Sequence, residues 1–221
     1  MGENYLDHVV INVKDDMDLA QLVFSNLGFT LTPRGYHTLG SINHLMMFGS
    51  DYMELIGFPE HGVANNPNAR PDLTTAPFGI NGLVFKSSDV DKTFEKLVEL
   101  EMDGDPPKSF SRPVELDGRK TDAKFRTVTV RAGVFPEGRV YFCEHGTPEL
   151  VWRPEWQSHR IGIEAVSEIV VVTREPAKSA DLYIKLLGTS LVKKSLGKSV
   201  ETVSYTHLRA HETGRNVVCR L

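Results

Sequence analysis

The sequence has only two cysteines and contains no long uncharged apolar run. Two cysteines cannot form a disulfide framework, and their scarcity favours a reducing compartment. No segment approaches the ~20 apolar residues that span a bilayer. The acidic start, Met1–Asn4, lacks the basic and apolar regions of a signal peptide. We therefore expect a cytoplasmic protein that does not bind a membrane.

The chain also lacks a strong excess of charge. Its net charge is -4 and its pI about 6.1, so it has no electrostatic footprint for nucleic acid. With 221 residues, 40% of them hydrophobic, it can form one large domain or two small ones. The partner we expect is a small-molecule substrate, and we leave a homodimer open.

A strand followed by a helix occurs three times. Twenty positions separate His8 from Gly28, and twenty separate Glu168 from Gly188. Asn81 opens the middle copy at the same strand position. Such self-similarity is typical of a protein assembled from one repeated unit. The repeated strand position carries His, Asn and Glu, all of which can ligate metals.

Each of the first two copies extends into a βαβββ unit. The first occupies residues 1–58 and the second 78–146, so that 1–146 together form one domain. The strands predicted by alternation and turn residues are 5–13, 29–32, 44–48 and 52–56, then 80–85, 127–131 and 139–144. Ser88 and Asp91 have capping-box spacing before the second helix. Residues 104–125, with their Pro, Gly and many charges, are expected to form an expanded β-loop-β excursion. The fold class is α+β, a curved mixed sheet that forms a cup.

The C-terminal part begins a third unit and does not complete it. Residues 147–166 form a connector, and 167–202 hold one strand, a helix and the start of a second strand. Residues 203–221 show no further strand pattern and resemble translated sequencing-adapter read-through. We expect this tail to be non-native and dispensable for stability, and the true protein to continue into full third and fourth units.

His8 and Glu54 are the first candidates for a metal site. Strand parity places His8 on one face with Leu6, Val10 and Asn12. Glu54 lies in an apolar strand, where a carboxylate is costly to bury unless it is paired or bound to a metal. His and Glu on neighbouring strands form half of a divalent-metal site. The alternative is a hydrogen-bonded core histidine and an edge-exposed glutamate.

The second unit supplies the remaining candidates. Aligning the two fourth strands by placing Phe142 against Tyr52 puts Glu144 opposite Glu54, and alternation sends Cys143 and His145 to the other face. Cys143 has no activating partner for nucleophilic chemistry, so we assign it to the core. The predicted metal ligands are His8, Glu54 and Glu144.

Substrate contacts are predicted from polar positions around the cup. His37 and Asn43 flank or belong to a polar stretch between strands, where substrates are commonly held. Arg126 can pair with a substrate carboxylate. Asn81 is a poor ligand for zinc-like ions, so we place it among the substrate-binding residues.

Tandem βαβββ units with His8 in the first strand and Glu54 in the fourth resemble the vicinal oxygen chelate superfamily. That group holds glyoxalase I, bleomycin- and fosfomycin-resistance proteins, methylmalonyl-CoA epimerase and extradiol dioxygenases. Residues 37–54 are similar to its glyoxalase-like branch, and the resemblance covers roughly 4–200. It implies a cup around one divalent metal (zinc, manganese, iron or nickel) that chelates two vicinal substrate oxygens. It also implies that Glu144 is the catalytic base.

Three functions remain open. The first is a metal-dependent lyase, isomerase or dioxygenase acting in the cup. The second is a metal-free module that sequesters a small molecule, as resistance proteins do; Asn81 at a usual histidine position supports it. The third is a structural half of a four-unit enzyme, which Glu168 at the third histidine position weakens.

Overall fold

An eight-stranded sheet in the order β2-β3-β4-β1-β5-β8-β7-β6 carries both repeated units. The computed structural model describes residues 5–59, 70–116, 118–189, 192–196, 201–205 and 219–220. The first unit consists of β1 (Leu6–Lys14), α1 (Met17–Leu27), β2 (Gly35–Tyr36), β3 (Ile42–Met47) and β4 (Tyr52–Gly57). The second consists of β5 (Gly79–Lys86), α4 (Val90–Glu99), β6 (Lys108–Leu116), β7 (Arg119–Thr129) and β8 (Arg139–His145), preceded by α3 (Pro71–Thr74).

The two units join through their first strands. β1 pairs parallel with β4 and antiparallel with β5, and β5 in turn pairs parallel with β8. The same pattern on both sides of the β1–β5 seam makes the sheet mixed and pseudo-symmetric. This confirms the predicted α+β fold and curved mixed sheet.

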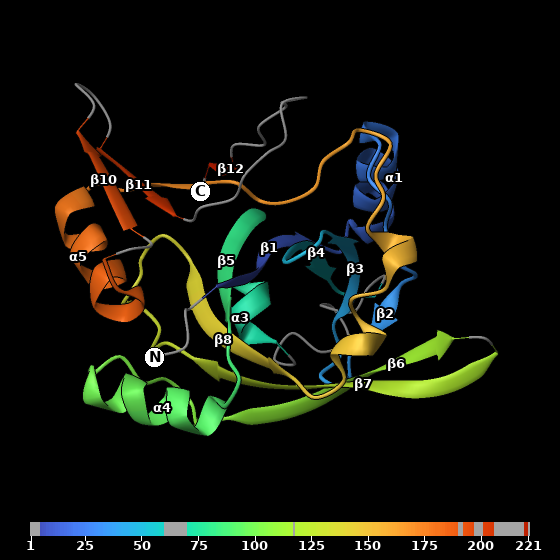
Figure 1. Cartoon of the computed structure of the whole chain (residues 1–221), viewed down its shortest axis with the longest axis horizontal. Coiled ribbons are helices and arrows are strands. Elements are labelled where there is room, and N and C mark those ends of the chain that lie inside the picture. Colours follow the sequence, from blue (N-terminus) through green and yellow to red (C-terminus); the bar gives the residue numbers. More distant parts are fainter. Residues whose placement is uncertain are drawn as a thin grey trace.

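The outermost strands approach each other and nearly close the sheet into a barrel. The long β6–β7 hairpin runs along the lower edge of Figure 1 and passes beneath β2. The backbone N–H of Thr38, just after β2, donates to the carbonyl oxygen of Ser111 on β6 at 3.1 Å. The sheet therefore surrounds a cavity, and the excursion predicted at 104–125 forms one of its walls.

The two faces of the sheet bury different clusters. The outer face packs against α1 and α4, with Val9, Leu55 and Phe142 among its buried side chains. The inner face is lined by a second cluster that includes Val10 and Tyr52. Separating the faces in this way leaves α1 and α4 outside, whereas α3 borders the cavity on the inner side.

Several predicted boundaries differ from the structure. Residues 29–32 form no strand, and the short β2 follows at Gly35–Tyr36 instead. The N-cap of α4 is Asp89, whose carboxylate accepts from the N–H groups of Asp91 and Lys92, so the predicted Ser88 capping box is wrong. An aspartate at this position satisfies two of the free N–H groups at the helix start.

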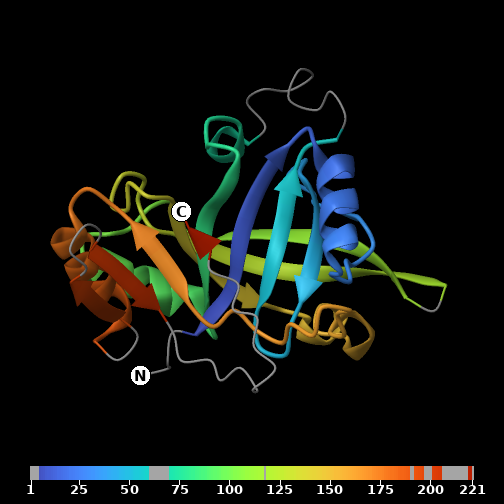
Figure 2. The ribbon, with the colours of Figure 1, turned by 90° about the horizontal axis from the view of Figure 1, so that it is seen from above.

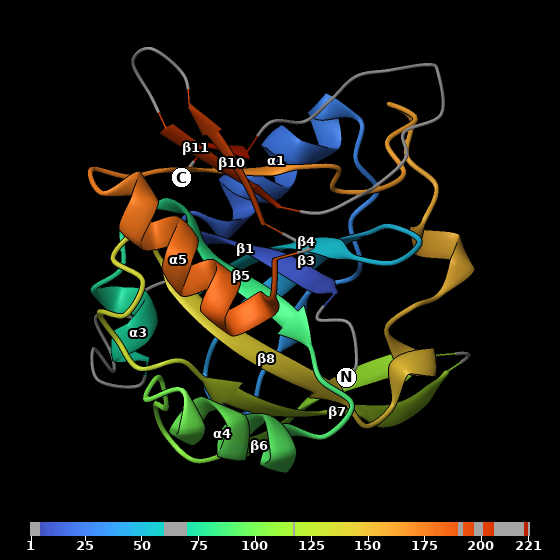
Figure 3. The ribbon, with the colours of Figure 1, turned by 60° about the vertical axis from the view of Figure 1, so that its left-hand side comes forward.

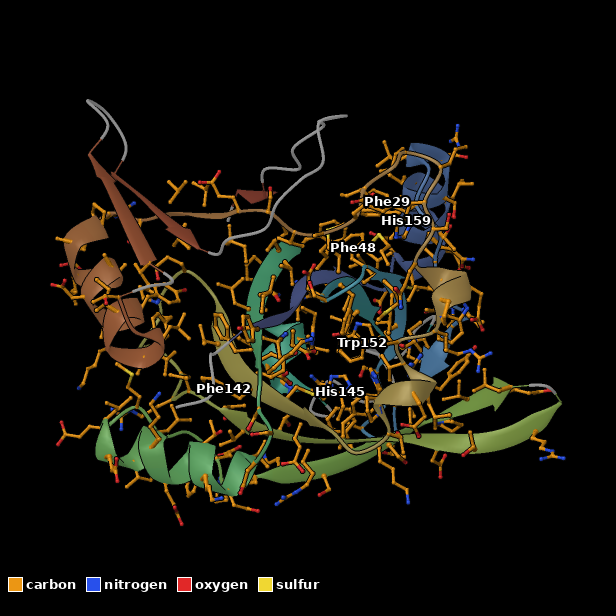
Figure 4. The ribbon with its side chains drawn as sticks, viewed as in Figure 1. Phe29, Phe48, Phe142, His145, Trp152 and His159 are labelled. Atoms are coloured by element: carbon orange, nitrogen blue, oxygen red, sulfur yellow. The ribbon has the colours of Figure 1, made fainter. Side chains whose placement is uncertain are left out.

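The connector returns to the first unit after β8. It contains η1 (Pro148–Leu150) and η2 (Pro154–Trp156). His159 accepts the N–H of Thr30 at Nδ1 (3.0 Å) and donates from Nε2 to the carbonyl of Met47 (2.8 Å). Its ring lies against Phe48, as Figure 4 shows. The N–H of Val166 donates to the carboxylate of Asp51 at 3.0 Å. The connector therefore fastens the second unit to the first.

The C-terminal elements form a separate four-stranded sheet, β10-β11-β9-β12. They are β9 (Ile169–Val172), α5 (Pro176–Leu187), β10 (Val192–Leu196), β11 (Glu201–Tyr205) and β12 (Cys219–Arg220). α5 lies beside α4, where Lys96 Nζ donates to the Leu186 carbonyl (Figure 3). In Figures 1 and 2, α5, β10 and β11 lie on the left of the molecule and α1 lies on the right.

β11 and β12 correct the expectation that residues 203–221 contain no strand, since β11 pairs antiparallel with β9 and β12 pairs parallel with it. Residues 206–218 and 221 lie outside the described residues, and the non-native origin of this tail stays a prediction. Within the described parts of the chain, no helix has the length and apolar character needed to cross a membrane.

Candidate functional site

His8 and Glu54 meet at the buried end of the cavity. His8 lies on β1 and Glu54 on the adjacent β4, and both side chains are buried. His8 Nε2 is 3.5 Å from Glu54 Oε2, so the approach predicted from strand parity is present. In the described part of the chain, no Lys or Arg forms an ion pair with Glu54. A buried carboxylate beside one imidazole is an environment that favours an added cation.

Asp7 orients His8 although the two are neighbours on one strand. The register of β1 against β5 shifts between Leu6 and His8, and this irregularity turns both Asp7 and His8 away from the outer cluster that contains Leu6. Asp7 Oδ1 is 2.6 Å from His8 Nδ1. With Nδ1 held by a carboxylate, Nε2 is the ring nitrogen presented to Glu54. The prediction that Leu6 shares the face of His8 is wrong because of this bulge.

His145 binds the same carboxylate from the second unit. Its Nε2 lies 3.1 Å from both oxygens of Asp7, and its ring packs 4.7 Å from Trp152 (Figure 4). Burial alone would raise the pKa of Asp7, but the hydrogen bonds from His145 and His8 outweigh it and hold that pKa well below its ordinary value. Asp7 is therefore a fixed negative charge behind His8.

Asn43 and His37 continue the polar network on the other side of Glu54. The Asn43 amide donates to Glu54 Oε1 at 2.7 Å and lies 3.3 Å from His37 Nε2. His37 Nδ1 is 2.9 Å from the Ser41 hydroxyl. Burial lowers the pKa of His37 to about 4, although Glu54 opposes the shift. The structure thus brings together His37, Asn43, His8 and Glu54, all four predicted from the sequence.

Two tyrosines enclose His8. Tyr52 stacks on its ring with centroids 4.4 Å apart, and the Tyr141 hydroxyl lies 3.4 Å from Nε2. Burial raises the pKa of the Tyr141 hydroxyl, so it remains protonated and can donate. The chemistry of His8 Nε2 is therefore confined to a small volume shared with one carboxylate and one phenol.

The cavity has a volume of about 1060 Å³ and opens beyond this polar end. On one side Arg70 binds the Asp72 carboxylate through Nε and Nη2, at 2.9 and 2.8 Å, and Arg139 binds the same carboxylate. The volume falls at the upper end of those that hold small ligands. The cup can therefore enclose a small molecule whose reacting end faces His8 and Glu54.

Glu144 and Arg126 lie on the outer face of the sheet, which corrects their assignment to the site. Glu144 Oε2 accepts the backbone N–H of Val90 at 2.9 Å, at the start of α4. Arg126 pairs with Asp91 on the same helix. The error comes from aligning Phe142 with Tyr52. Phe142 packs in the outer cluster, and it is Tyr141 that packs with Tyr52 inside. A slip of one residue moves every side chain of a strand to the other face.

Asn81 borders the cavity, held by its neighbours. The register of β5 against β1 shifts between the pairs that flank it, Gly82 with Val10 and Ile80 with Ile11, so Asn81 occupies a bulge. Its amide donates to the Pro77 carbonyl at 3.2 Å, and its Oδ1 lies 3.4 Å from Arg139 Nη2. Neither contact involves His8 or Glu54.

Sequence reasoning missed three inner-face residues. Asp7, Cys143 and His145 offer a carboxylate oxygen, a thiol sulfur and an imidazole nitrogen within 4.8 Å of one another, a set that could hold a metal ion. Burial raises the pKa of the Cys143 thiol well above its ordinary value, which disfavours the thiolate that metals bind. The alternation of β8 could have found two of them, because it puts Cys143 and His145 on one face with Tyr141; no local signal marks Asp7.

The chain is similar to one protein family in sequence and to several solved structures in fold. The profile of a family described as glyoxalase-like domain matches residues 6–187. A hypothetical protein from Staphylococcus aureus is similar in structure, with a TM-score of 0.68, 14% identity, and coverage of 91% of this chain and 81% of that one. A methylmalonyl-CoA epimerase from Streptomyces coelicolor has a TM-score of 0.45 and 13% identity, over 66% of this chain and 96% of its own. A search of curated proteins gave no match.

Proposed function

Because this chain belongs to the glyoxalase-like domain family of the vicinal oxygen chelate superfamily, we propose that it is a metal-dependent enzyme acting on a small substrate with vicinal oxygens. The observation that carries the proposal is the convergence of His8 Nε2 and Glu54 Oε2, 3.5 Å apart at the buried end of the cavity. His8 and Glu54 would hold the ion. A bound divalent ion supplies a Lewis acid that polarises substrate oxygens.

The surrounding residues fit this role in specific ways. The carboxylate of Asp7 accepts a hydrogen bond from His8 Nδ1. A contact of this kind fixes the orientation of most metal-binding histidines. Asn43 holds one oxygen of Glu54 and leaves the other facing His8. Tyr141 places a hydroxyl beside His8 Nε2, where it can donate to a substrate oxygen. Two protein ligands leave most coordination positions for substrate and water.

Metal titration tests the proposal. Zinc, manganese, iron(II) and nickel would each be titrated into chelator-treated protein and into the variants His8→Gln and Glu54→Gln, with binding measured by calorimetry. We expect one ion per wild-type chain and loss of binding in both variants. Glu144→Gln is the matched control, because that carboxylate lies outside the cup. Unchanged metal affinity in Glu54→Gln, or no metal binding in the wild type, would contradict the metal-enzyme proposal.

A second candidate function, a metal-free binding module, has one observation in its favour. Among the described residues of the second unit, Glu144 lies outside the cup, Asn81 binds the Pro77 carbonyl, and His145 contacts Asp7 and not Glu54. Asn81→His discriminates between the two candidates. An imidazole at this position of β5 should tighten metal binding in an enzyme built around His8 and Glu54, and should create no tight site in a metal-free module.

A further inference from the structure

Arg112 is a buried cation whose Nε and Nη2 have no partner among the described residues. It lies on β6, lines the cavity and is only 3% exposed. Its Nε and Nη2 atoms are both buried, and their N–H groups donate to no acceptor among the described residues. The described part of the chain also provides Arg112 with no ion pair. Arginine is rarely buried unless it is paired, and each orphaned donor costs free energy. The structure around Arg112 is therefore incomplete without an anion.

The identity of the orphaned atoms narrows the anion. In a guanidinium group, Nε–H and one N–H of Nη2 point from the same edge, which matches the two oxygens of a carboxylate. We propose that Arg112 binds a carboxylate group of the ligand in the cup. This inference rests on the proposed function in one respect, that the cup holds a small-molecule substrate, and it does not require a metal.

The position of Arg112 is built into the neighbouring strand. Gly35 on β2 lies against it, and a Cβ there would come within 2.3 Å of both Arg112 Cδ and Asn43 Oδ1. The absence of a side chain at Gly35 leaves room for the guanidinium beside Asn43. Because Asn43 also binds Glu54, a carboxylate on Arg112 lies one side chain away from the reacting end of the cavity.

Two other arginines of the cavity, Arg70 and Arg139, are already neutralised in part, and Arg131 donates to the Glu101 carbonyl. Arg70 and Arg139 share Asp72, and Arg70 also donates to Ser41. A phosphate dianion would need more donors than the single free edge of Arg112 offers, so a monoanionic carboxylate fits better. Beside Arg112 on the inner face, Phe110 stacks on Phe125 with centroids 5.2 Å apart, which gives an apolar wall for the body of the ligand.

Binding of simple acids tests the assignment. Acetate, pyruvate, benzoate and phenylacetate would be titrated by NMR into the full-length protein, with benzamide and phenylacetamide as uncharged matches and inorganic phosphate as the competing anion. We expect at least one carboxylate to bind about tenfold or more tightly than its amide, and Arg112→Gln to remove that difference. Arg112→Lys should restore it only in part, because an ammonium lacks the two-pronged edge.

Two controls keep this test separate from the metal proposal. Arg126→Gln removes an exposed arginine from the outer face of the neighbouring strand and should leave carboxylate binding unchanged. The titrations are run once with chelator and once with zinc, because Arg112 should bind the carboxylate under both conditions. Carboxylate binding that needs zinc and survives Arg112→Gln would overturn this proposal while supporting the metal site. Equal binding of acids and amides, stronger binding of phosphate, or no acid binding at all would overturn it as well.

Discussion

Asp7 Oδ1 lies 2.6 Å from His8 Nδ1, although a regular strand would turn adjacent residues to opposite faces. The register shift between Leu6 and His8 brings the two side chains to the same face and so makes this contact possible. Asp7 is fully buried and receives a second imidazole, His145, from the other unit. One irregular residue thus gives His8 a fixed ring orientation and links the two units at the site.

Asp7→Asn should therefore weaken the site without removing a ligand. A neutral amide cannot accept hydrogen bonds from both imidazoles as the charged carboxylate does. We therefore expect a fall of about 10–100-fold in metal affinity or activity. Melting curves should show lower stability as well, because His8 and His145 lose a buried acceptor. Asp18→Asn, a surface substitution whose carboxylate is paired with Arg34, is the control. Unchanged metal affinity in Asp7→Asn would contradict the orienting role.

Glu54→Gln should have opposite effects on stability and on metal response. In chelator-treated protein the buried carboxylate has no Arg or Lys partner among the described residues, so a neutral isostere should raise stability by about 1–3 kcal/mol. Added zinc should raise the melting temperature of the wild type and leave that of the variant unchanged. Glu144→Gln should instead cost about 1 kcal/mol, because it weakens the acceptor of the Val90 N–H. The comparison is made by thermal melts with and without zinc.

Acid should destabilise the fold through His37. Its pKa is lowered to about 4 by burial, with Arg112 and Arg70 contributing and Glu54 opposing. Below its ordinary value of about 6.5 the unfolded chain binds a proton that the folded protein does not, so stability falls as the pH drops from about 6.5 to 4. We expect His37→Gln to remove on the order of 2 kcal/mol of that loss.

The measurement for His37 is the free energy of unfolding by urea at a series of pH values. His44 and His159, whose pKa values are also lowered by burial, contribute in the same direction in both proteins. The difference between wild type and His37→Gln isolates the single residue. Parallel pH profiles for the two proteins would show that His37 titrates normally.

Gly35→Ala should disturb the cavity from behind. The added Cβ would lie 2.3 Å from Arg112 Cδ and from Asn43 Oδ1, so both buried side chains must move. We expect a loss of about 1–3 kcal/mol of stability and weaker carboxylate binding. Gly49→Ala is the matched control, since a Cβ there meets nothing within 4 Å. Equal melting temperatures for the two variants would show that Arg112 has room to shift.

Regular alternation was enough to predict much of the site. The pairing of His8 with Glu54 follows from strand parity together with the family resemblance. Asn43 and His37 follow from their place in a polar stretch before and within β3. The inner position of Tyr52 beside Glu54 follows from the same rule and is present. These predictions succeeded because β3 and β4 pair without interruption from residue 42 to residue 57.

The failures occur where alternation breaks or where the reference residue was wrong. Bulges at Asp7 and Asn81 change the face of their neighbours, and nothing in the local sequence reports an extra residue in a strand. Glu144 was misplaced by matching one aromatic residue with another of the wrong parity. Arg112 was missed because residues 104–125 were interpreted as an excursion with a loop. Phe110 and Val114 nevertheless lie two residues before and after Arg112 on the same face of the strand.

The shared carboxylate of Asp7 has a consequence for the order of synthesis. Asp7 leaves the ribosome early, yet its partner His145 follows 138 residues later, and His159 reaches Met47 across 112 residues. The buried Asp7 carboxylate therefore gains its second imidazole only after β8 has been made, and the Met47 carbonyl gains its partner later still. A nascent chain halted after the first unit therefore carries His8 and Asp7 without His145, and the candidate site is complete only when the second half has emerged.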